Sequence, residues 1–507
     1  MGETKQGPSG PDFKVGVPLA DVIDGKALRG KCGDEDVMVV RTGGRIFAVS
    51  PGCTHYSGPL EDGLIDGATV RCPWHHACFS LETGASLRAP GLNPLTLWRV
   101  ERRGDRVYVT GKAESAPPRA RSKPGLPKSV VIVGGGAAGA TAAVTLRREG
   151  FTGEVTILSA DSDAPYDRPN CSKDYLAGKA PAEWMPLFGD DYYRDNGIEL
   201  RLNTRVTGVD VRRKQVQVGG DTFAFDALLL ATGATPIRVP VQGAPESAVF
   251  TLRSLADSKK IAAAAEGKKR ALVLGASFIG LEAAWSLRER GLDVTVAAPE
   301  DTPLERVLGK ELGTFLKALH EEHGVKFRLG RTAQSMLSGT VTLSDGSRVA
   351  ADLIVMGVGV RPNLDLAVAA GLAVENGVLV DEYMATSAPG IWAVGDIARW
   401  PDPISGQRIR VEHWVVAERQ GQVAARNILG DRRRYHSVPF FWSSHYDRQI
   451  NYVGHAPKWD RVAIDGDFGS GDFRVDYFVG KRRVAVATVG RDTESLAAEL
   501  ELERAYT

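Results

Sequence analysis

Few cysteines, no excess of charge and no long apolar run characterise this sequence. Its 507 residues include five cysteines, which are too few and too clustered for a disulfide scaffold. Lysine and arginine (63 residues) almost balance aspartate and glutamate (62), so the chain lacks the strong basic field that nucleic-acid binding usually needs. No apolar run approaches the ~18–20 residues required to span a bilayer. These absences predict a chain that binds neither nucleic acid nor membrane.

The cellular location and the number of domains follow from the same composition. The sequence does not open with a charged and then apolar secretory segment, which together with the few cysteines predicts a reducing cytoplasm. A hydrophobic content of 43% and this length allow roughly three or four domains of ~100–200 residues each. We therefore expect a multidomain cytoplasmic protein.

Changes in residue pattern divide the chain into a β domain, a linker, two α/β units and a final small domain. Residues 11–111 alternate short β-type runs with glycine-rich turns, which predicts an all-β domain. Residues 112–127 are proline-rich and basic, the composition of an extended linker. From Ser129 the order strand, glycine turn, helix, strand occurs twice, which predicts a pair of Rossmann-type α/β units. Residues 433–507 return to aromatic β-like stretches and are expected to form a small α+β domain.

Three of the five cysteines and three of the nine histidines lie close together near the start of the chain. Cys53-x-His55 and, after sixteen residues, Cys72-x-x-His75 each offer one thiolate and one imidazole. This spacing suits a two-iron cluster, in which each loop gives its cysteine to one iron and its histidine to the other, as in a Rieske 2Fe-2S centre. A structural zinc site built from four such ligands is the alternative.

The first α/β unit carries a dinucleotide-binding glycine motif. Gly134-x-Gly136-x-x-Gly139 follows the strand SVVIV and opens a helix, so its glycines can form the tight turn and let the backbone approach a pyrophosphate. The helix N-terminus favours the anion. Asp161, at the end of the next strand, can accept a ribose hydroxyl. The residues expected to approach this dinucleotide are Gly134, Gly136, Ala137, Ala138, Gly139 and Asp161.

The second unit has the same pattern with serine in place of the middle glycine. At the end of its second strand, where a ribose-binding acid is expected, stands Ala298, and Glu300 is the nearest carboxylate. The stretch AAPEDTP contains no arginine that could bind the 2′-phosphate of NADPH, which favours NADH. The nearby Arg306 leaves NADPH as the alternative. The residues expected to approach this nucleotide are Gly275, Ser277, Phe278, Ile279, Gly280 and Glu300.

From residue 128 onward the chain resembles the pyridine nucleotide-disulfide oxidoreductase superfamily, and within it the FAD-dependent ferredoxin reductases and apoptosis-inducing factor. The resemblance rests on PYDRPNCSKDYL, LLLATGATP, GASFIGLE, TSAPGIWAVGD and EHWVVAERQG. It implies an FAD-binding domain from 128–247 and 373–432, an NAD(P)H-binding domain from 248–372, and a reductase C-terminal domain from 433–507. Fusion to an N-terminal Rieske domain is the pattern of the Rieske-containing apoptosis-inducing-factor-like proteins.

The same resemblance implies roles for individual residues. Lys173 resembles the lysine beside flavin N5, and Glu282 resembles its ion-pair partner, so these two are the predicted catalytic residues. Hydride arriving at N5 makes the flavin ring more negative, and a nearby ammonium stabilises that charge. Cys171 stands where the family has leucine, and we expect it to act as a small apolar substitute. Further residues expected near the FAD or the nicotinamide are Arg168, Pro169, Thr232, Gly233, Gly395, Asp396, Glu412, His413 and Trp414.

The stretch CPWHHACF resembles low-potential Rieske ferredoxins rather than respiratory Rieske proteins. Gly58 and Trp74 stand at the positions of the cysteine pair that forms a disulfide in the respiratory type. Ala77 and Phe79 replace the serine and tyrosine that donate hydrogen bonds to the cluster there, and such bonds raise the potential. This resemblance implies a potential toward the low end of the roughly −150 to +300 mV Rieske range.

These observations predict electron flow from NADH to FAD, then to the Rieske cluster, and finally to an unknown acceptor protein or small molecule. The loop tip Trp74-His75-His76 is the predicted exit for electrons. His76 and Cys78 are not needed as ligands, and both are expected to pack under or beside the loop. One alternative is a redox sensor similar to apoptosis-inducing factor. Another is an FAD-dependent NADH oxidase or peroxidase that uses Cys171. We expect a monomer or a homodimer.

Overall fold

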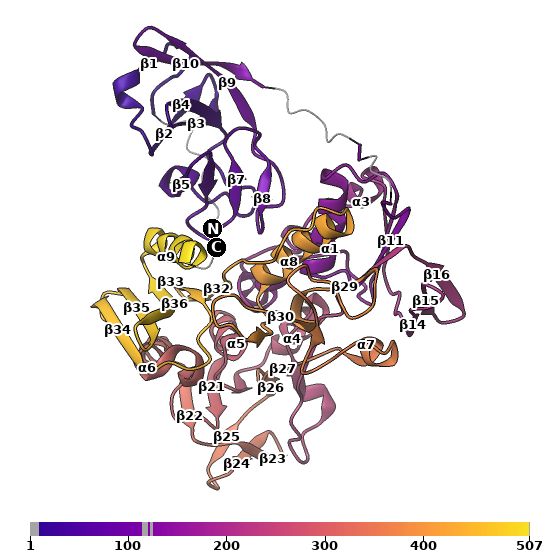
Figure 1. The fold of residues 1–507 in the computed structure, drawn as a ribbon. Helices are drawn as coiled ribbons and strands as arrows, with labels where there is room; N and C mark the ends of the chain where they lie inside the picture. Colours follow the sequence, from indigo (N-terminus) through magenta and orange to yellow (C-terminus); the bar gives the residue numbers. More distant parts are fainter. Residues whose placement is uncertain (1–9, 114–119, 122–124, 506–507) are drawn as a thin grey trace. The chain divides into compact units, whose positions relative to one another are not determined.

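The computed structural model describes residues 10–113, 120–121 and 125–505 (Figure 1). Most of the predicted linker, residues 114–119 and 122–124, lies outside the described residues. The chain divides into two compact units, which are described separately. The first takes its residues from the range up to Ala120 and from Arg491 onward, and the second from Arg121–Gly490.

The first unit is built on two antiparallel β-sheets, as the sequence predicts. The larger sheet has six strands, in the order β1 (Val17–Pro18), β10 (Arg106–Lys112), β9 (Leu97–Arg103), β4 (Arg45–Val49), β3 (Glu35–Thr42) and β2 (Ala27–Cys32). The smaller sheet has four strands, in the order β5 (Leu64–Asp66), β6 (Thr69–Arg71), β7 (Cys78–Ser80) and β8 (Ser86–Arg88). Both sheets frame the loops that carry the cysteine–histidine pattern.

Strand β3 shows why the six-stranded sheet is covered on both faces. Successive side chains of a strand point to opposite faces. Val37 and Val39 pack in one hydrophobic cluster with Trp98, whereas Met38 and Val40 pack in a second cluster that includes both Cys53 and Cys72. A continuous apolar run therefore supports the cysteine-bearing loops from one side and closes a separate core on the other.

The final helix of the chain belongs to the first unit. Helix α9 (Asp492–Ala505) follows the last strand of the C-terminal sheet after Gly490 and Arg491. The sequence predicts a single C-terminal domain over 433–507, yet α9 contacts β5 and groups with the residues before Ala120. The helix is therefore an integral part of the unit that carries the cysteine and histidine loops.

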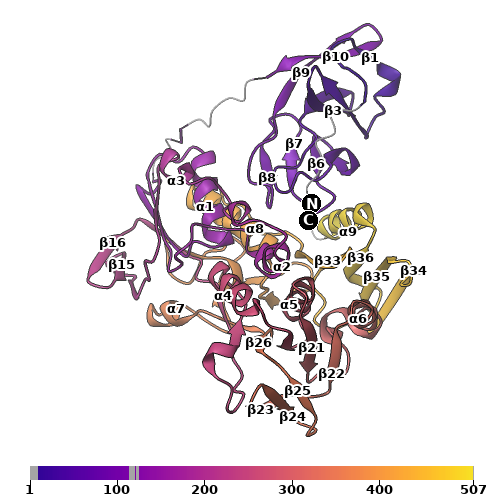
Figure 2. The ribbon, with the colours of Figure 1, turned by 180° about the vertical axis from the view of Figure 1, so that it is seen from behind.

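The second unit begins with a parallel five-stranded sheet that matches the first predicted Rossmann-type unit. Its order is β13 (Ile198–Arg201), β12 (Glu154–Leu158), β11 (Ser129–Val133), β17 (Ala227–Leu230) and β29 (Ile391–Ala393). Helix α1 (Ala137–Arg148) packs against α8 (Trp414–Ile428), and the two lie side by side in both views (Figure 2). Two segments far apart in the sequence, one before and one after the second parallel sheet, thus form one layered domain.

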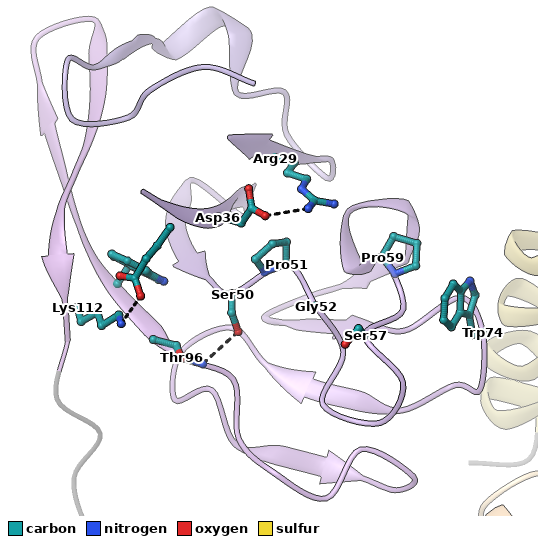
Figure 3. A pocket seen from close by; sticks show the side chains of 12 residues that line it. Arg29, Asp36, Ser50, Pro51, Gly52, Ser57, Pro59, Trp74, Thr96 and Lys112 are labelled. Atoms are coloured by element: carbon teal, nitrogen blue, oxygen red, sulfur yellow. Dashed lines mark hydrogen bonds and ion pairs between the residues drawn. The ribbon is translucent and has the colours of Figure 1, made fainter. Parts of the chain in front are cut away.

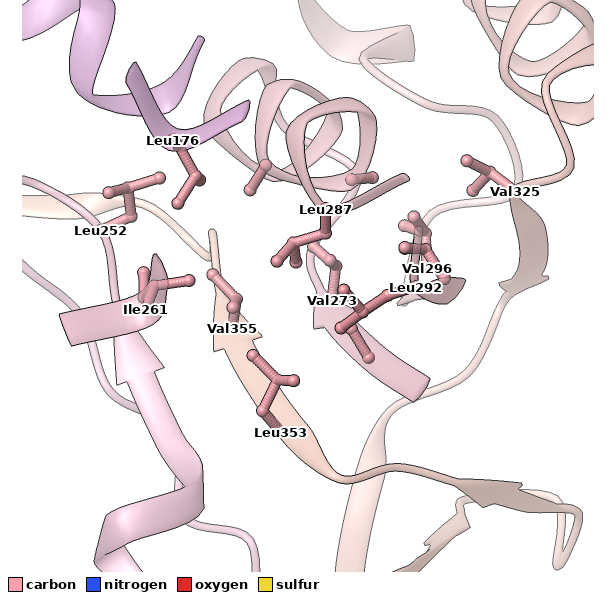
Figure 4. Packing of buried hydrophobic residues seen from close by; sticks show 14 of the residues in the cluster. Leu176, Leu252, Ile261, Val273, Leu287, Leu292, Val296, Val325, Leu353 and Val355 are labelled. Carbon is pink, nitrogen blue, oxygen red and sulfur yellow. The ribbon is translucent and has the colours of Figure 1, made fainter. Parts of the chain in front are cut away.

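A second parallel sheet matches the second predicted α/β unit. Its order is β19 (Val249–Thr251), β26 (Leu353–Met356), β20 (Arg270–Leu274), β21 (Asp293–Ala298) and β22 (Lys326–Leu329). Figure 4 shows its core, where Val273 of β20 and Val355 of β26 pack against Leu287 of α5 (Phe278–Glu289) and Ile261 of α4 (Leu255–Ala265). Such valine-rich, two-sided burial is typical of strands in parallel sheets. Two small antiparallel sheets accompany these parallel sheets. One, formed by β14 (Gly208–Asp210), β15 (Gln215–Val218) and β16 (Asp221–Ala224), contacts β11 of the first parallel sheet. The other, formed by β23 (Ala333–Leu337), β24 (Thr340–Leu343) and β25 (Arg348–Ala350), contacts β20 of the second.

A final antiparallel sheet packs on two helices of the second α/β unit. Its order is β32 (Phe440–His445), β33 (Arg448–Gly454), β36 (Arg482–Val489), β35 (Asp472–Val479) and β34 (Arg461–Asp467). Leu281 of α5 and Leu312 of α6 (Glu305–Glu322) share a buried cluster with Tyr452 and Phe473 of this sheet. This packing brings side chains of β32 against α5 and α6. Within the described residues, no helix is both long and apolar enough to cross a lipid bilayer.

Candidate redox centres

The four predicted cluster ligands lie together as two pairs. Cys53 lies in the loop after β4, and Cys72 lies in the turn between β6 and β7, where their thiols hydrogen-bond to each other. The Nδ1 atoms of His55 and His75 are 3.1 Å apart. Each loop is held tightly by its own backbone, for example by the Cys72 N–H donating to the Ala77 carbonyl at 2.8 Å.

The pairing fits two irons better than one metal ion. A zinc ion would need all four ligand atoms around one point at ~2.0–2.3 Å. Two thiolates on one side and two imidazoles on the other are instead the donor set of a Rieske cluster. The chemistry and the spacing of the donors therefore fit a 2Fe-2S group.

The two loops leave no room for a disulfide at Gly58. A Cβ atom added to Gly58 would lie 2.9 Å from the sulfur of Cys72 and 3.1 Å from the Trp74 ring. All five cysteines lie within the described residues, and none of them forms a disulfide. Ala77 and Phe79 are completely buried in this core and carry no side-chain donor. The surroundings of the thiols are therefore apolar.

Only part of the predicted electron exit reaches the surface. Trp74 is 36% exposed and Tyr56 is 37% exposed, whereas His75 is 5% exposed and His76 is completely buried. The buried position of His76 agrees with its expected packing beside the loop, and Trp74 is the most exposed of the three residues at the predicted electron exit. The ring of Tyr56 stacks on His55, with 3.8 Å between the ring centroids. Aromatic rings that contact the two imidazoles thus form the exposed part of this centre.

A cavity of about 530 Å³ lies beside the loops, lined in part by Ser57, Pro59 and Trp74 (Figure 3). The charged groups at its wall are paired with one another. Arg29 binds Asp36 at 3.0 Å and Glu61 at 2.6 Å. With its charges neutralised in this way, the cavity does not indicate a charged ligand.

A cavity of about 990 Å³ lies at the carboxyl ends of the strands of the first α/β unit. This is the position at which open α/β sheets bind ligands. Its size is at the top of the range of about 300–1,000 Å³ seen for ligand pockets. The predicted residues that line it are Gly134, Gly136, Ala137, Ala138, Asp161, Arg168, Thr232, Gly233, Gly395 and Asp396. Ten residues chosen from separate motifs thus line a single cavity.

The walls of this cavity fit a phosphate-bearing dinucleotide. A Cβ atom on Gly139 would overlap the carbonyl oxygen of Gly134, so the close turn requires glycine there. No side chain caps the N-terminus of α1, which leaves its backbone N–H groups for a ligand. The buried Nε of Arg168 has no hydrogen-bond partner among the described residues, and its guanidinium lies next to Gly136. A buried unpaired donor at a helix N-terminus indicates an anionic ligand.

The cavity also includes residues that sequence patterns do not reveal. Arg253 forms an ion pair with Asp396, and both side chains line the cavity. Burial lowers the pKa of Arg253, although Asp396 acts in the opposite direction. Asn363 lines the same cavity and donates a hydrogen bond from its Nδ2 to the carbonyl of Thr232 at 2.9 Å. Sequence patterns could not indicate Arg253 or Asn363, because the residues that each one contacts in the cavity, Asp396 and Thr232, lie more than a hundred positions away.

The predicted catalytic pair is in contact. Lys173 Nζ lies 2.9 Å from Glu282 Oε2, and Glu282 is 2% exposed. Ser172 and Ser443 also donate hydrogen bonds to the Glu282 carboxylate, at 2.5 Å and 2.6 Å. Lys173 donates a further bond to the carbonyl of Pro169. Neither Lys173 nor Pro169 lines the large cavity directly, so the pair lies beside it rather than in its wall.

The second glycine turn repeats the geometry of the first. A Cβ atom on Gly280 would overlap the carbonyl oxygen of Gly275, as Gly139 would with Gly134. Ser277, which replaces the middle glycine, accepts a hydrogen bond from the Gly280 N–H at 3.2 Å and so caps α5. It also donates to the carbonyl of Gly357 at 2.6 Å. The serine therefore strengthens the turn.

The remaining residues of this unit surround the turn and the strand end. Ile279 at the start of α5 is 40% exposed, next to Phe278, which packs on the ring of Phe441. Ala298 at the end of β21 is buried, and Glu300 is half-buried. A carboxylate near the strand end is thus available, but two residues later than the usual position.

Glu412, His413 and Trp414 lie at the start of α8. Glu412 is bound by Arg410. Burial lowers the pKa of His413 to about 3, and its Nδ1 has no hydrogen-bond partner among the described residues. Its ring lies 4.6 Å from the ring of Phe441. A neutral, partly unsatisfied imidazole at a helix start is compatible with a ligand that supplies the missing hydrogen bond.

Cys171 lies in an apolar environment. It is 2% exposed and packs with Tyr166, Met185 and Leu255. Burial raises the pKa of the Cys171 thiol to about 12. Redox cysteines need an accessible thiolate. The surroundings therefore favour the small apolar substitute that the sequence indicates over a peroxidase cysteine.

Two stacked Rossmann-type units with glycine turns, and a β unit with paired cysteines and histidines, define a flavin- and nicotinamide-dependent oxidoreductase with an iron–sulfur centre. The chain belongs to the pyridine nucleotide-disulphide oxidoreductase family, whose sequence model matches residues 128–421. The Rieske [2Fe-2S] domain model matches residues 14–99, and the reductase C-terminal model matches residues 440–506. FAD, NAD(H) and a Rieske 2Fe-2S cluster are accordingly its cofactors.

Several known proteins resemble the chain over most of its length. Human apoptosis-inducing factor 3 is 33% identical over 495 residues, which cover 94% of this chain and 81% of that protein. Rhodocoxin reductase from Rhodococcus erythropolis is 35% identical over 376 residues, 73% of this chain and 88% of that protein. The crystal structure of the covalent putidaredoxin reductase–putidaredoxin complex matches with a TM-score of 0.72 and 35% identity, over 74% of this chain and 93% of that one. The protein is thus an enzyme of the ferredoxin-reductase type with an added Rieske domain.

Proposed function

We propose that the protein passes electrons from NADH to FAD, from FAD to its own Rieske cluster, and from the cluster to a separate acceptor. The observation that carries this proposal is the pairing of the ligand atoms in the first unit, with His55 Nδ1 3.1 Å from His75 Nδ1 and the Cys53 and Cys72 thiols in contact. NADH gives up electrons as a hydride pair, whereas a 2Fe-2S cluster accepts one at a time, so a flavin between them is chemically required. The predicted sites for NADH, FAD and the cluster all lie in one chain.

Individual residues are assigned to these steps as follows. Cys53 and Cys72 hold one iron, and His55 and His75 hold the other. Arg168 and the N-terminus of α1 neutralise the phosphates of FAD. Lys173, oriented by Glu282, stabilises the negative charge that hydride transfer brings to the flavin ring. The nicotinamide dinucleotide binds at the turn after β20.

The nucleotide is NADH rather than NADPH. Glu300 supplies the carboxylate for a ribose hydroxyl near the end of β21, and the same carboxylate would repel a 2′-phosphate. The exposed Arg306, which favours NADPH, lies at the start of α6 rather than at the end of β21. Arg331, whose backbone N–H donates to the carbonyl of Ala298 at that strand end, is bound to Asp345.

The acceptor is a protein that takes single electrons. Two relatives carry the names rhodocoxin reductase and putidaredoxin reductase, and the matched crystal structure holds such a reductase with its protein partner. The exposed rings of Trp74 and Tyr56 form the contact surface for that acceptor. A small-molecule acceptor is the alternative. The five unbridged cysteines suit a reducing cytoplasm, and because each centre is built from one chain, a monomer is sufficient for turnover.

Anaerobic rapid mixing with NADH tests the proposal. We expect the flavin absorption to bleach first and the EPR signal of a reduced Rieske cluster to appear afterwards, in the absence of any other protein. A Cys72→Ser variant should still show flavin bleaching but no cluster signal. A reduced flavin that persists beside an oxidised cluster would contradict the proposal and support the redox-sensor alternative.

A further inference from the structure

A continuous row of polar side chains leads from Glu282 through the interior of the second unit. The hydroxyl of Ser443 lies 2.6 Å from Glu282 Oε1 and 3.0 Å from Nε2 of His445. Nδ1 of His445 lies 3.2 Å from Nε2 of His320, and Nδ1 of His320 lies 3.5 Å from the hydroxyl of Tyr446. Three elements meet in this row, which comprises Glu282 of α5, Ser443 and His445 of β32, and His320 of α6.

The row is closed at one end and reaches the surface at the other. Ser443, His445 and His320 are completely buried, and Glu282 is 2% exposed. Tyr446 is half-buried, and its ring stacks on the exposed His323 with 3.6 Å between ring centroids. Burying three polar side chains is costly unless they hydrogen-bond to one another, and hydrophobic residues would fill the same space at lower cost. A functional reason for the row is therefore worth seeking.

The hydrogen bonds of the row all have the same direction. Glu282 is paired with Lys173, so its carboxylate can only accept, and the single O–H of Ser443 must donate to it. Ser443 must then accept from the Nε2–H of His445. The bare Nδ1 of His445 accepts from the Nε2–H of His320, whose Nδ1 accepts from the O–H of Tyr446. Every donor thus points toward Glu282.

Both histidines are neutral, which a relay requires. Burial lowers the pKa of His445 to about 3, and the nearby Lys173 acts in the same direction. Burial also holds the pKa of His320 well below its usual value, with smaller contributions from His445 and His323. The charged and titratable groups that face the row are Lys173 and Glu282 at its inner end, and His323, Tyr446, Arg288 and Glu289 at its outer end. Each neutral imidazole keeps one N–H donor and one bare nitrogen.

We propose that this row, from Glu282 through Ser443, His445 and His320 to Tyr446, moves one proton inward when the flavin is reduced and returns it when the electrons leave. The inference rests on the proposed function, because it needs Lys173 beside the flavin. When hydride arrives, each donor in the row passes its proton one step inward, Ser443 protonates Glu282, and the solvent replaces the proton of Tyr446. The positive charge of Lys173 is then no longer balanced by Glu282, so it stabilises the reduced flavin more strongly.

The shift balances in protons and electrons. Each step breaks one O–H or N–H bond and forms one at the next acceptor, and no electron moves along the row. After the inward shift every donor points outward, so the return shift needs no rotation of a side chain. The proton taken up is given back, and it cancels in the overall conversion of NADH to NAD⁺, one proton and two electrons.

Proton uptake measured during flavin reduction tests the proposal. In the full-length holoenzyme, mixed anaerobically with NADH and a pH indicator in weak buffer, we expect proton uptake to coincide with flavin bleaching. Ser443→Ala removes the hydroxyl between Glu282 and His445 with little change in volume, and uptake should then lag behind bleaching by about 100-fold or more. Ser444→Ala is the matched control, since the adjacent side chain points to the other face of β32. It should behave like the unaltered protein.

Imidazole rescue and a spectroscopic readout separate a relay from a structural role. In His320→Ala, added imidazole should shorten the lag, whereas lost packing would not be restored in this way. In protein labelled with ¹⁵N-histidine, with or without FAD, we expect coupling across the His320 Nε2–His445 Nδ1 hydrogen bond and no titration of either ring between pH 5 and 9. Uptake in Ser443→Ala as fast as in the unaltered protein, or no uptake in the unaltered protein, would overturn the proposal. Both results concern the flavin step alone, so they are distinguishable from a failure of electron transfer to the cluster.

Discussion

Glu499, a completely buried residue of the last helix, lies with its Oε2 3.1 Å from Nδ1 of His76, the residue next to the predicted ligand His75. His76 adopts a φ of 61°, in the left-handed region that is unfavourable for a residue with a side chain. Ser495, one turn earlier on α9, lies 3.3 Å from the other ring nitrogen of His76. Two side chains of the C-terminal helix therefore hold the unusual conformation of the second cluster-binding loop.

Removing the Glu499 carboxylate should destabilise the first unit. Glu499 also binds Arg71 at 3.3 Å, and taking away one member of a buried ion pair costs about 3 kcal/mol or more because the remaining charge is left uncompensated. We expect Glu499→Ala to lower the temperature at which the visible absorption of the cluster is lost. Glu501→Ala, on the exposed side of the same helix, should change that temperature little. Equal effects of the two substitutions would show that α9 does not support the loop.

Replacing one histidine ligand should change the nature of the cluster. A His75→Cys variant places a third thiolate on the irons, and the EPR spectrum should lose its Rieske character because the two-nitrogen iron no longer exists. Cys78→Ser alters a buried cysteine of the same loop outside the ligand set, and we expect its spectrum to be unchanged. A Rieske spectrum that survives in His75→Cys would contradict the ligand assignment.

The ammonium of Lys173 should matter for hydride transfer. Lys173→Met keeps the length of the side chain but removes the charge, and the rate of flavin bleaching by NADH should fall by about 100-fold, the usual effect of losing one stabilising donor at the reacting centre. Lys179→Met is a suitable control, because Lys179 is half exposed and pairs with Glu289. Stopped-flow absorbance measures both. The FAD content of each variant must be determined, since a loss of FAD would produce the same decrease for a different reason.

Cys171 should be unreactive in the folded protein. A raised thiol pKa of about 12 means that the thiol stays neutral at pH 7–8, and that its reactivity rises only as the pH approaches 12. We expect iodoacetamide to label Cys171 in urea but not in buffer, as judged by mass spectrometry. NADH turnover by Cys171→Ser should remain within about twofold of the unaltered protein, because the residue only fills space. Fast labelling at pH 7 would revive the peroxidase alternative.

The preference for NADH should depend on Glu300. Glu300→Arg removes the repulsion between the Glu300 carboxylate and the 2′-phosphate of NADPH, and it adds a positively charged partner for that phosphate. Because one charged hydrogen bond contributes at least the free energy of a tenfold change, the ratio of kcat/KM for NADPH to kcat/KM for NADH should rise by about tenfold. Glu305→Arg, which begins α6, introduces the same charge away from the strand end and serves as the control. An unchanged ratio in Glu300→Arg would place the ribose elsewhere.

Much of the candidate site could be predicted from short stretches of sequence. The spacing of Cys53 and His55, and of Cys72 and His75, selects a two-iron cluster because ligands on tight loops reach a metal only at certain intervals. The glycine turns are equally local, since Gly139 and Gly280 are needed where a helix starts against its own preceding strand. Each of these features depends on residues within about thirty positions of one another, as a βαβ unit requires.

The sequence by itself determined the cofactors and the order of the domains. Only the tertiary structure decided that α9 supports the His76 loop, that Arg253 meets Asp396, and that β32 lies against α5 and α6 to build the row of Ser443, His445 and His320. The contacts that join different elements here connect residues separated by 125 to 423 positions. These residue pairs meet only when the sheets and helices that carry them pack together. A short stretch of sequence does not show which distant element will lie against it, so these contacts could not be predicted.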